Sequence, residues 1–388
     1  MTTVLKPLFT LCFLLGLYNC QGNTKANSKN LLAINETIDP KPKKQTIKVA
    51  LLLDTSNSMD GLIDQAKAQL WQIVNELSYA KCDGDKPSLE IALYEYGNDN
   101  LTSEEGYIRQ VLAFSNDLDD ISKELFSLTT NGGNEYCGYV INSSINQLSW
   151  GANEKDLKLI FIAGNEPFTQ GSISYKEASN LAKDKDITVN TIFCGEYNLG
   201  ISTYWKDGAD LAKGNYMAIN HNKATTYVST PFDQQILDLN TKLNGTYVSY
   251  GANGRSKLAE QAVQDTNASG YSSANAVNRT VSKSSHLYKN SNWDLVDAVE
   301  NDFVDLKKIK RDQLPAELKD KSLEEIKKHI EKKQKERKAI NQKIQELNSK
   351  RREYIANQQK NNKDENLENA MIKAIKTQAK TKNYSWGN

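Results

Sequence analysis

The chain has 388 residues, 25% of them charged, and its 49 lysines and arginines are balanced by 48 aspartates and glutamates. A formal net charge of +1 argues against the large basic surface that nucleic-acid binding requires, so we expect no nucleic-acid partner. In the carboxyl-terminal region, basic residues are interleaved with glutamates, a mixture that is typical of a solvated helix face.

The first twenty residues are typical of an export signal. Residues 8–17 form an apolar stretch that is too short to span a membrane, and a leucine stands three positions before Cys20. This ending resembles a bacterial lipobox, which predicts lipidation of Cys20 and a membrane-anchored lipoprotein in the periplasm or at the outer membrane. Because Tyr18 and Asn19 are larger than most lipobox residues, cleavage without lipidation is the alternative. The polar residues 21–44 would form a tether.

Between residues 45 and 244, apolar runs alternate with segments in which apolar residues recur every three or four positions. The runs predict strands at 47–53, 89–96, 107–114, 157–163, 187–193 and 216–219. The segments predict helices at 62–77, 118–128, 139–148, 175–183, 204–211 and 231–243. Alternation of this kind indicates βαβ units, so we expect an α/β fold with a doubly wound, mostly parallel sheet.

Oxygen-bearing side chains follow the first predicted strand. Asp54, Ser56 and Ser58 stand where this strand ends and the first helix approaches. Ligands of open α/β sheets bind at the carboxyl ends of the strands, and carboxylate and hydroxyl oxygens suit a hard cation. The same side chains could instead cap the first helix by accepting hydrogen bonds from its free amide groups. The residues themselves leave both interpretations open.

This Asp-x-Ser-x-Ser motif, with the order of strands and helices around it, resembles the metal-ion-dependent adhesion site (MIDAS) of von Willebrand factor type A (vWA) domains. The resemblance implies a vWA domain at residues 45–244. It also implies that Asp54, Ser56 and Ser58 bind Mg²⁺, or else Ca²⁺ or Mn²⁺. In this family the metal commonly keeps an open position for an acidic side chain of a protein partner.

The resemblance is less complete on the other two metal loops of the family. The second loop usually supplies a threonine, and here Glu135 is the first candidate ligand and Thr130 the second. The third loop often reads Thr-Asp-Gly-Glu-Pro, whereas this chain has Gly164 at the aspartate position, so that ligand is missing. A carboxylate from Glu135 would restore the lost charge, because hard cations accept oxygen ligands of several kinds.

Three cysteines remain once the signal is removed and Cys20 is lipidated. Cys137 follows the second loop and Cys194 ends a predicted strand, so both should lie at the carboxyl edge of the sheet, whereas Cys82 should lie at the opposite edge. Outside the cytoplasm such a pair would oxidise, which predicts a Cys137–Cys194 disulfide. The alternative is three buried free thiols.

Past residue 244 the composition changes. Residues 245–310 are read as a helical linker region, 311–360 as a charged helical segment, and 361–388 as a polar basic tail. Arginines 337 and 351 fall on the predicted heptad seam of the charged segment, which therefore makes a poor dimeric coiled coil. We expect a helical hairpin, or a helix that lies against the main domain.

The function that the sequence favours is a protein-binding module of the cell envelope, which uses its cation for adhesion or complex assembly. One alternative is a metal-free scaffold that interacts through its carboxyl-terminal helices. A metal-assisted hydrolase has less support, because the chain has three histidines and lacks the H-E-x-x-H, G-x-S-x-G and P-loop motifs. We therefore expect no enzyme activity.

Overall fold

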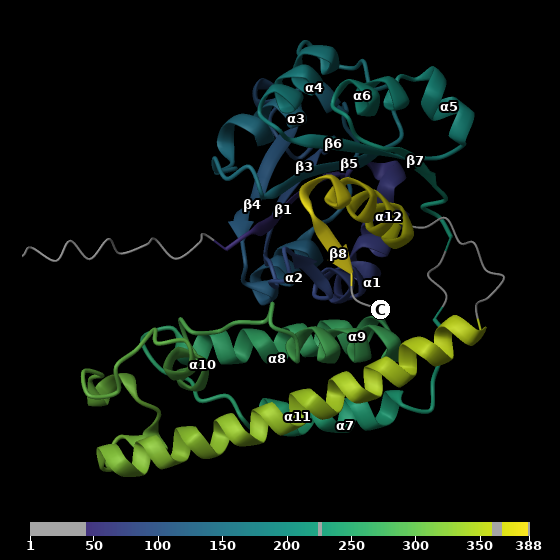
Figure 1. Ribbon diagram of the computed structural model, residues 1–388. Helices are drawn as coiled ribbons and strands as arrows, with labels where there is room; N and C mark the ends of the chain where they lie inside the picture. The colour runs from purple at the N-terminus through teal and green to yellow at the C-terminus, as the bar shows by residue number, and fades with distance from the viewer. Residues whose placement is uncertain (1–43, 224–226, 359–366, 387–388) are drawn as a thin grey trace, which may run out of the picture. The chain divides into compact units, whose positions relative to one another are not determined.

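The structure is a computed structural model that describes residues 44–223, 227–358 and 367–386 (Figure 1). The expected export signal, the lipidation site Cys20 and all but the last residue of the expected tether lie outside these ranges. Within them, no helix combines the length and the apolar character that crossing a bilayer requires.

The central sheet consists of β1 (Thr46–Asp54), β3 (Ser88–Tyr96), β4 (Ile108–Ser115), β5 (Leu157–Gly164), β6 (Thr188–Cys194) and β7 (Tyr216–Ile219). The strand order is β4-β3-β1-β5-β6-β7, and all neighbours run parallel except β3 and β4. The expected α/β fold with a mostly parallel sheet is confirmed. Strand β1 lies inside the sheet because its apolar residues are buried on both faces.

Side chains of the sheet alternate between two apolar cores. In β1, Leu51 and Leu53 belong to one core, and Ala50 and Leu52 belong to the other. The first core is covered by α1 (Asp60–Leu77), α2 (Leu118–Ser127) and α12 (Leu367–Ala379). The second core is covered by α3 (Cys137–Gln147), α4 (Tyr175–Asp184) and α6 (Trp205–Leu211), on the opposite side of the sheet (Figure 1).

A set of helices follows the sheet in sequence and packs on the α1 and α2 side. They are α7 (Asp233–Asn244), α8 (Gly254–Tyr271), α9 (Ser273–Lys283), α10 (Leu295–Glu300) and α11 (Leu323–Gln358). Helix α9 packs against α1 and α8 packs against α2, while α7 and α11 pack against α9 and against each other. These helices therefore form a second layer over the covered face of the sheet (Figure 1).

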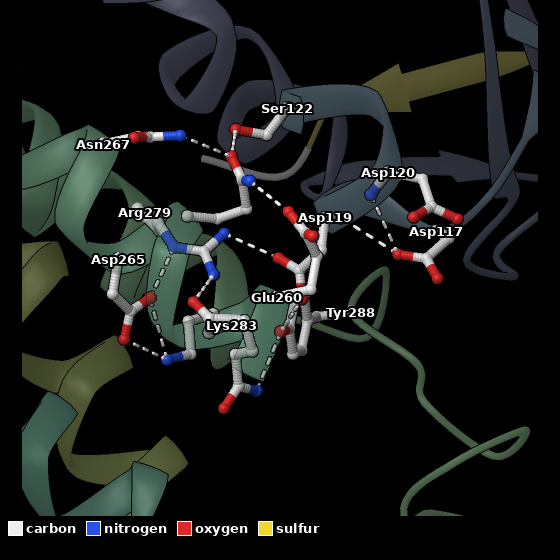
Figure 2. Close-up of polar contacts among 12 residues, drawn as sticks. Asp117, Asp119, Asp120, Ser122, Glu260, Asp265, Asn267, Arg279, Lys283 and Tyr288 are labelled. Carbon is white, nitrogen blue, oxygen red and sulfur yellow. Dashed lines mark hydrogen bonds and ion pairs between the residues drawn. The ribbon is translucent and has the colours of Figure 1, made fainter. Parts of the chain in front are cut away.

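A buried ion network joins this second layer to α2 (Figure 2). Arg279 of α9 is 1% exposed and binds Asp119 of α2 at 2.8 Å and Asp265 of α8 at 2.5 Å. The hydroxyl of Tyr288 donates a hydrogen bond to Asp119 at 2.6 Å. Lys283 also binds Asp265, at 2.9 Å. The network thus contains two cations and two carboxylates, contributed by three helices.

The pKa shifts in this network follow from burial and from how the charges are shared. Although burial disfavours its charged form, the cations Arg279 and Lys283 hold the pKa of Asp265 below its ordinary value. Burial disfavours the charged form of Lys283 and lowers its pKa from 10.5 to about 8. Asp265, which Lys283 shares with Arg279, opposes this shift, whereas the positive charge of Arg279 adds to it. One aspartate therefore stabilises two cations unequally.

Helix α11 places its seam arginines inside the chain. Arg337 binds Asp294 at 2.6 Å and Asp297 at 2.5 Å, and Arg351 binds Asp233 at 3.0 Å. Both arginines are buried between α11 and the helices beneath it. The charged positions that oppose a dimeric coiled coil therefore serve contacts within the chain.

The segment read as a polar basic tail, residues 361–388, contains regular structure in its described part. Helix α12 packs on α1 and on β5, β6 and β7. A short strand follows, β8 (Tyr384–Trp386), and it pairs antiparallel with β2 (Ala80–Cys82). The described part of this segment is thus built into the first core.

Candidate metal centre

Three loops meet at the carboxyl edge of the sheet. The first begins at Asp54, the last residue of β1, and carries Ser56 and Ser58 in and around a short 3-10 turn, η1 (Asn57–Met59). The second joins α2 to α3, and the third follows β5. Parallel strands bring the first and third loops to one edge, where β1 and β5 are neighbours. The second loop is held against the first by the amide of Asn131, which donates to the carbonyl of Thr55 at 2.9 Å.

The first loop is held by its own polar groups. The backbone amide of Ser56 donates to Oδ1 of Asp54 at 2.7 Å, and the hydroxyls of Ser56 and Ser58 lie 3.2 Å apart. Neither η1 nor α1 has a side-chain hydrogen bond at its N-cap. The capping interpretation of these side chains is therefore not supported, and their oxygens gather around one another instead.

The other carboxylate oxygen of Asp54, Oδ2, is buried and has no hydrogen-bond partner within the described chain. Such an atom is costly unless something satisfies it. Glu135 lies beside Asp54 and is itself 2% exposed, and its Oε2 accepts a hydrogen bond from the amide of Glu166 at 3.3 Å. Two buried carboxyl groups thus face each other at the centre of the three loops.

Burial raises the pKa of both carboxyl groups. For Asp54 the nearby Glu135 carboxyl adds to burial, and the pKa lies well above its ordinary value. For Glu135 burial outweighs the opposing effects of the nearby Asp54, Ser56 and Glu166 groups, and its pKa is also raised. A cation placed between them would favour the charged form of both groups.

The structure separates the two candidate ligands of the second loop. Glu135 lies with Asp54, as described above. Thr130 is partly exposed, and its hydroxyl donates to Asp60, the first residue of α1. On the third loop, the amide of Asn165 donates to the Ser58 hydroxyl at 3.2 Å. The sequence did not single out Asn165, although it lies next to Gly164.

The missing third-loop aspartate has a steric explanation. A Cβ atom added to Gly164 would lie 2.5 Å from the hydroxyl of Tyr96 and 3.1 Å from Oδ2 of Asp54. Tyr96 is fully buried, and its hydroxyl donates to the carbonyl of Ala163 at 2.9 Å. Tyr96 therefore fills the space that a third-loop side chain would need.

A second glycine, Gly97, borders the two buried carboxyl groups. Gly97, directly after β3, has φ +79°, and a Cβ there would lie 2.8 Å from Oδ1 of Asp54 and 2.9 Å from Cγ of Glu135. Glycine is required both by this backbone conformation and by the close approach. The Tyr-Gly pair that ends this strand is a sequence signal that could have drawn attention to both residues.

The expected disulfide between Cys137 and Cys194 is not formed, since both are free and buried, as is Cys82. Cys194 belongs to the core under α1, whereas Cys137 starts α3 and belongs to the opposite core. The sheet therefore separates the two sulfur atoms. The thiol of Cys137 instead contacts the hydroxyl of Tyr96 at 3.9 Å. Both cysteines do lie at the carboxyl edge, but on different faces.

The gathered donors fit a hard divalent cation. Asp54, Ser56, Ser58 and Glu135 would hold it, since carboxylate and hydroxyl oxygens are its preferred ligands. No group of three or more His, Cys, Asp or Glu side chains with metal-binding geometry occurs among the residues described. A site here would thus depend on hydroxyls as well as carboxylates. A bound cation would supply positive charge at an edge that is otherwise acidic.

Comparison with known proteins supports the fold. The sequence profile of the von Willebrand factor type A domain matches residues 48–240, and no curated protein matches the chain. BatB from Bacteroides thetaiotaomicron is 15% identical, with 58% of this chain and 98% of BatB covered and a TM-score of 0.35. An aerotolerance-related membrane protein from Bacteroides fragilis is 16% identical, with 45% of this chain and 93% of that protein covered and a TM-score of 0.32.

A structure of proximal thread matrix protein 1 from the mussel byssus has a zinc-occupied MIDAS motif. That protein is 13% identical, with 46% of this chain and 43% of that protein covered and a TM-score of 0.35. Similarity at this level carries no information on function. The profile match covers the six-stranded sheet, its flanking helices up to the middle of α7, and the three loops. Residues 48–240 of this chain form a von Willebrand factor type A domain.

Proposed function

We propose that the vWA domain binds a divalent cation through Asp54, Ser56, Ser58 and Glu135 and uses it to bind an acidic side chain of a protein partner. The observation that carries this proposal is the buried Oδ2 of Asp54, which lacks a partner within the described chain and faces a second buried carboxyl group. A cation would satisfy that oxygen and neutralise the pair.

The setting we propose is the cell envelope, where the protein would take part in adhesion or complex assembly. Lipidation of Cys20 would hold the domain at a membrane surface. A Cys20→Ser variant should leave the membrane fraction of a bacterial host, and mass spectrometry of the mature amino terminus should find an acylated cysteine in the parent. The role is binding and not catalysis, with Mg²⁺ as the first candidate and Ca²⁺ and Mn²⁺ as the others.

Thermal unfolding of the full chain tests the metal site. A cation that binds only the native state adds about 2.7 kcal/mol at about 100 times its dissociation constant, so the midpoint should rise with Mg²⁺, Ca²⁺ or Mn²⁺ relative to EDTA. Asp54→Asn should abolish this rise. In EDTA the same variant should be at least as stable as the parent, because one of two facing buried carboxyl groups is gone.

Asp238→Asn is the matched control, since Asp238 is an exposed aspartate on α7 that accepts a hydrogen bond from Gln234. It should keep the full cation-dependent rise. A parent chain whose midpoint is the same in EDTA and in each cation would refute the proposed site. An Asp54→Asn variant that is destabilised in EDTA by more than about 1 kcal/mol would show that Asp54 has a structural role instead.

A further inference from the structure

Exposed large apolar side chains concentrate on one short segment at the carboxyl edge of the sheet. Tyr197, Leu199, Ile201 and Tyr204 are 52%, 52%, 40% and 48% exposed. They lie on α5 (Tyr197–Ser202) and at the turn into α6, and we call them the α5 patch. Single exposed apolar residues are ordinary, but four within eight positions indicate an interaction surface.

The α5 patch is attached to the third metal loop. The indole of Trp205 donates to the carbonyl of Glu166 at 2.8 Å, and the amide of Phe168 donates to the carbonyl of Thr203 at 3.0 Å. Hydrogen bonds thus run in both directions between the loop after β5 and the turn from α5 to α6. The patch and the proposed cation site are parts of one continuous edge, with α5 beside α6 and β7 (Figure 1).

The inner side of α5 fixes which way the patch faces. Gly200 is buried, and a Cβ there would lie 2.1 Å from the hydroxyl of Tyr216 and 2.7 Å from the ring of Phe193. Helix α5 therefore lies directly on the sheet and can turn only its other side chains outward. Tyr204 has φ +71°, a conformation that is strained for a bulky residue and common at functional sites.

Charge indicates the kind of partner. Glu166 and Glu196 are exposed beside the patch, the nearby Lys206 is paired with Asp210, and Asp54 and Glu135 belong to the metal centre. This edge would repel an anionic lipid surface, and it would repel an acidic partner until a cation is bound. We propose that the α5 patch binds apolar side chains of a protein segment whose acidic residue reaches the cation. This inference rests on the proposed function and adds the chemistry of the partner.

A random 12-residue peptide library displayed on phage tests the inference. The full chain is immobilised, the library is bound in Mg²⁺, and bound phage are eluted with EDTA. The enriched peptides should contain an aspartate or glutamate together with at least two large apolar residues. The affinity of the best synthetic peptide should fall tenfold or more in Leu199→Ser.

Two measurements separate this inference from the proposed function. Val263→Ser is the matched control, because Val263 is 50% exposed but lies on α8, and it should bind the peptide like the parent. Leu199→Ser should keep the full Mg²⁺-dependent rise of the unfolding midpoint. If the parent shows no such rise, the proposed function fails, and the inference fails with it.

Other outcomes overturn the inference alone. Enriched peptides that carry a carboxylate without apolar residues, and that bind Leu199→Ser as well as the parent, would leave the cation site in place and refute the α5 patch. Sedimentation of the parent with phosphatidylcholine vesicles in EDTA, lost in Leu199→Ser, would identify a lipid surface instead. Concentration-dependent dimerisation that Leu199→Ser removes would identify a second copy of the chain.

Discussion

Gly164→Ala should destabilise the protein through one contact, and Tyr96→Phe should remove that effect. The new Cβ would lie 2.5 Å from the Tyr96 hydroxyl, which is about 1 Å too close, and Tyr96 is fully buried and hydrogen-bonded to Ala163. Overpacking of this kind costs about 1–3 kcal/mol. With phenylalanine at position 96, the nearest atoms to the Cβ would be those of Asp54, at 3.1 and 3.2 Å.

A double-mutant cycle tests this contact. The free energy of unfolding in urea is measured for the parent, Gly164→Ala, Tyr96→Phe and the double variant. Tyr96→Phe alone should cost about 1 kcal/mol, the value of one hydrogen bond. Gly164→Ala should cost about 1–2 kcal/mol less in the Tyr96→Phe background than in the parent. If its cost is equal in both backgrounds, Tyr96 does not explain why glycine stands at this position.

Three further predictions concern the helical layer and the cysteines. Arg279→Met should lower the free energy of unfolding by about 3–5 kcal/mol in urea, because the buried Asp119 carboxylate loses its cation, whereas the exposed control Arg352→Met should change it by less than about 1 kcal/mol. Because the pKa of Lys283 is lowered to about 8, the unfolded chain binds more protons above pH 8, so the free energy of unfolding should rise from pH 8 to about 9.5, a rise that is absent in Lys283→Met. Mass mapping of non-reduced peptides should recover Cys137 and Cys194 unlinked, and a linked peptide would contradict their placement on opposite faces.

The sheet and the position of the loop after β1 were predictable because their signals are local. A strand buried on both faces is a continuous apolar run, so the segment predicted at 157–163 became β5, Leu157–Gly164. Glu135 was placed near Asp54 by the resemblance to the second metal loop of vWA domains, since its own loop joins the helices α2 and α3. The side chain of Tyr96 could not be placed in this way, since the contact that excludes a residue at position 164 joins two separate strands.

Long-range pairing explains the other differences. Arg337 looked like a defect in a heptad seam because its partner, Asp294, lies 43 positions earlier in the chain. The disulfide prediction located both cysteines at the correct edge but neglected the alternation of side chains along β6, which turns Phe193 and Cys194 to opposite faces. Helix α12 did carry a local signal, since Leu367, Met371 and Ile375 recur at four-residue spacing.

The docking of α12 and β8 has a practical consequence for anyone who cuts this protein along its family boundary. A fragment that ends at residue 240 would lack Leu367 and Met371, which pack over Leu51, Phe161 and Ile192 of the sheet. It would also lose the strand that pairs with β2. Such a fragment would expose apolar core residues to solvent and leave the edge of β2 unpaired, and it should aggregate.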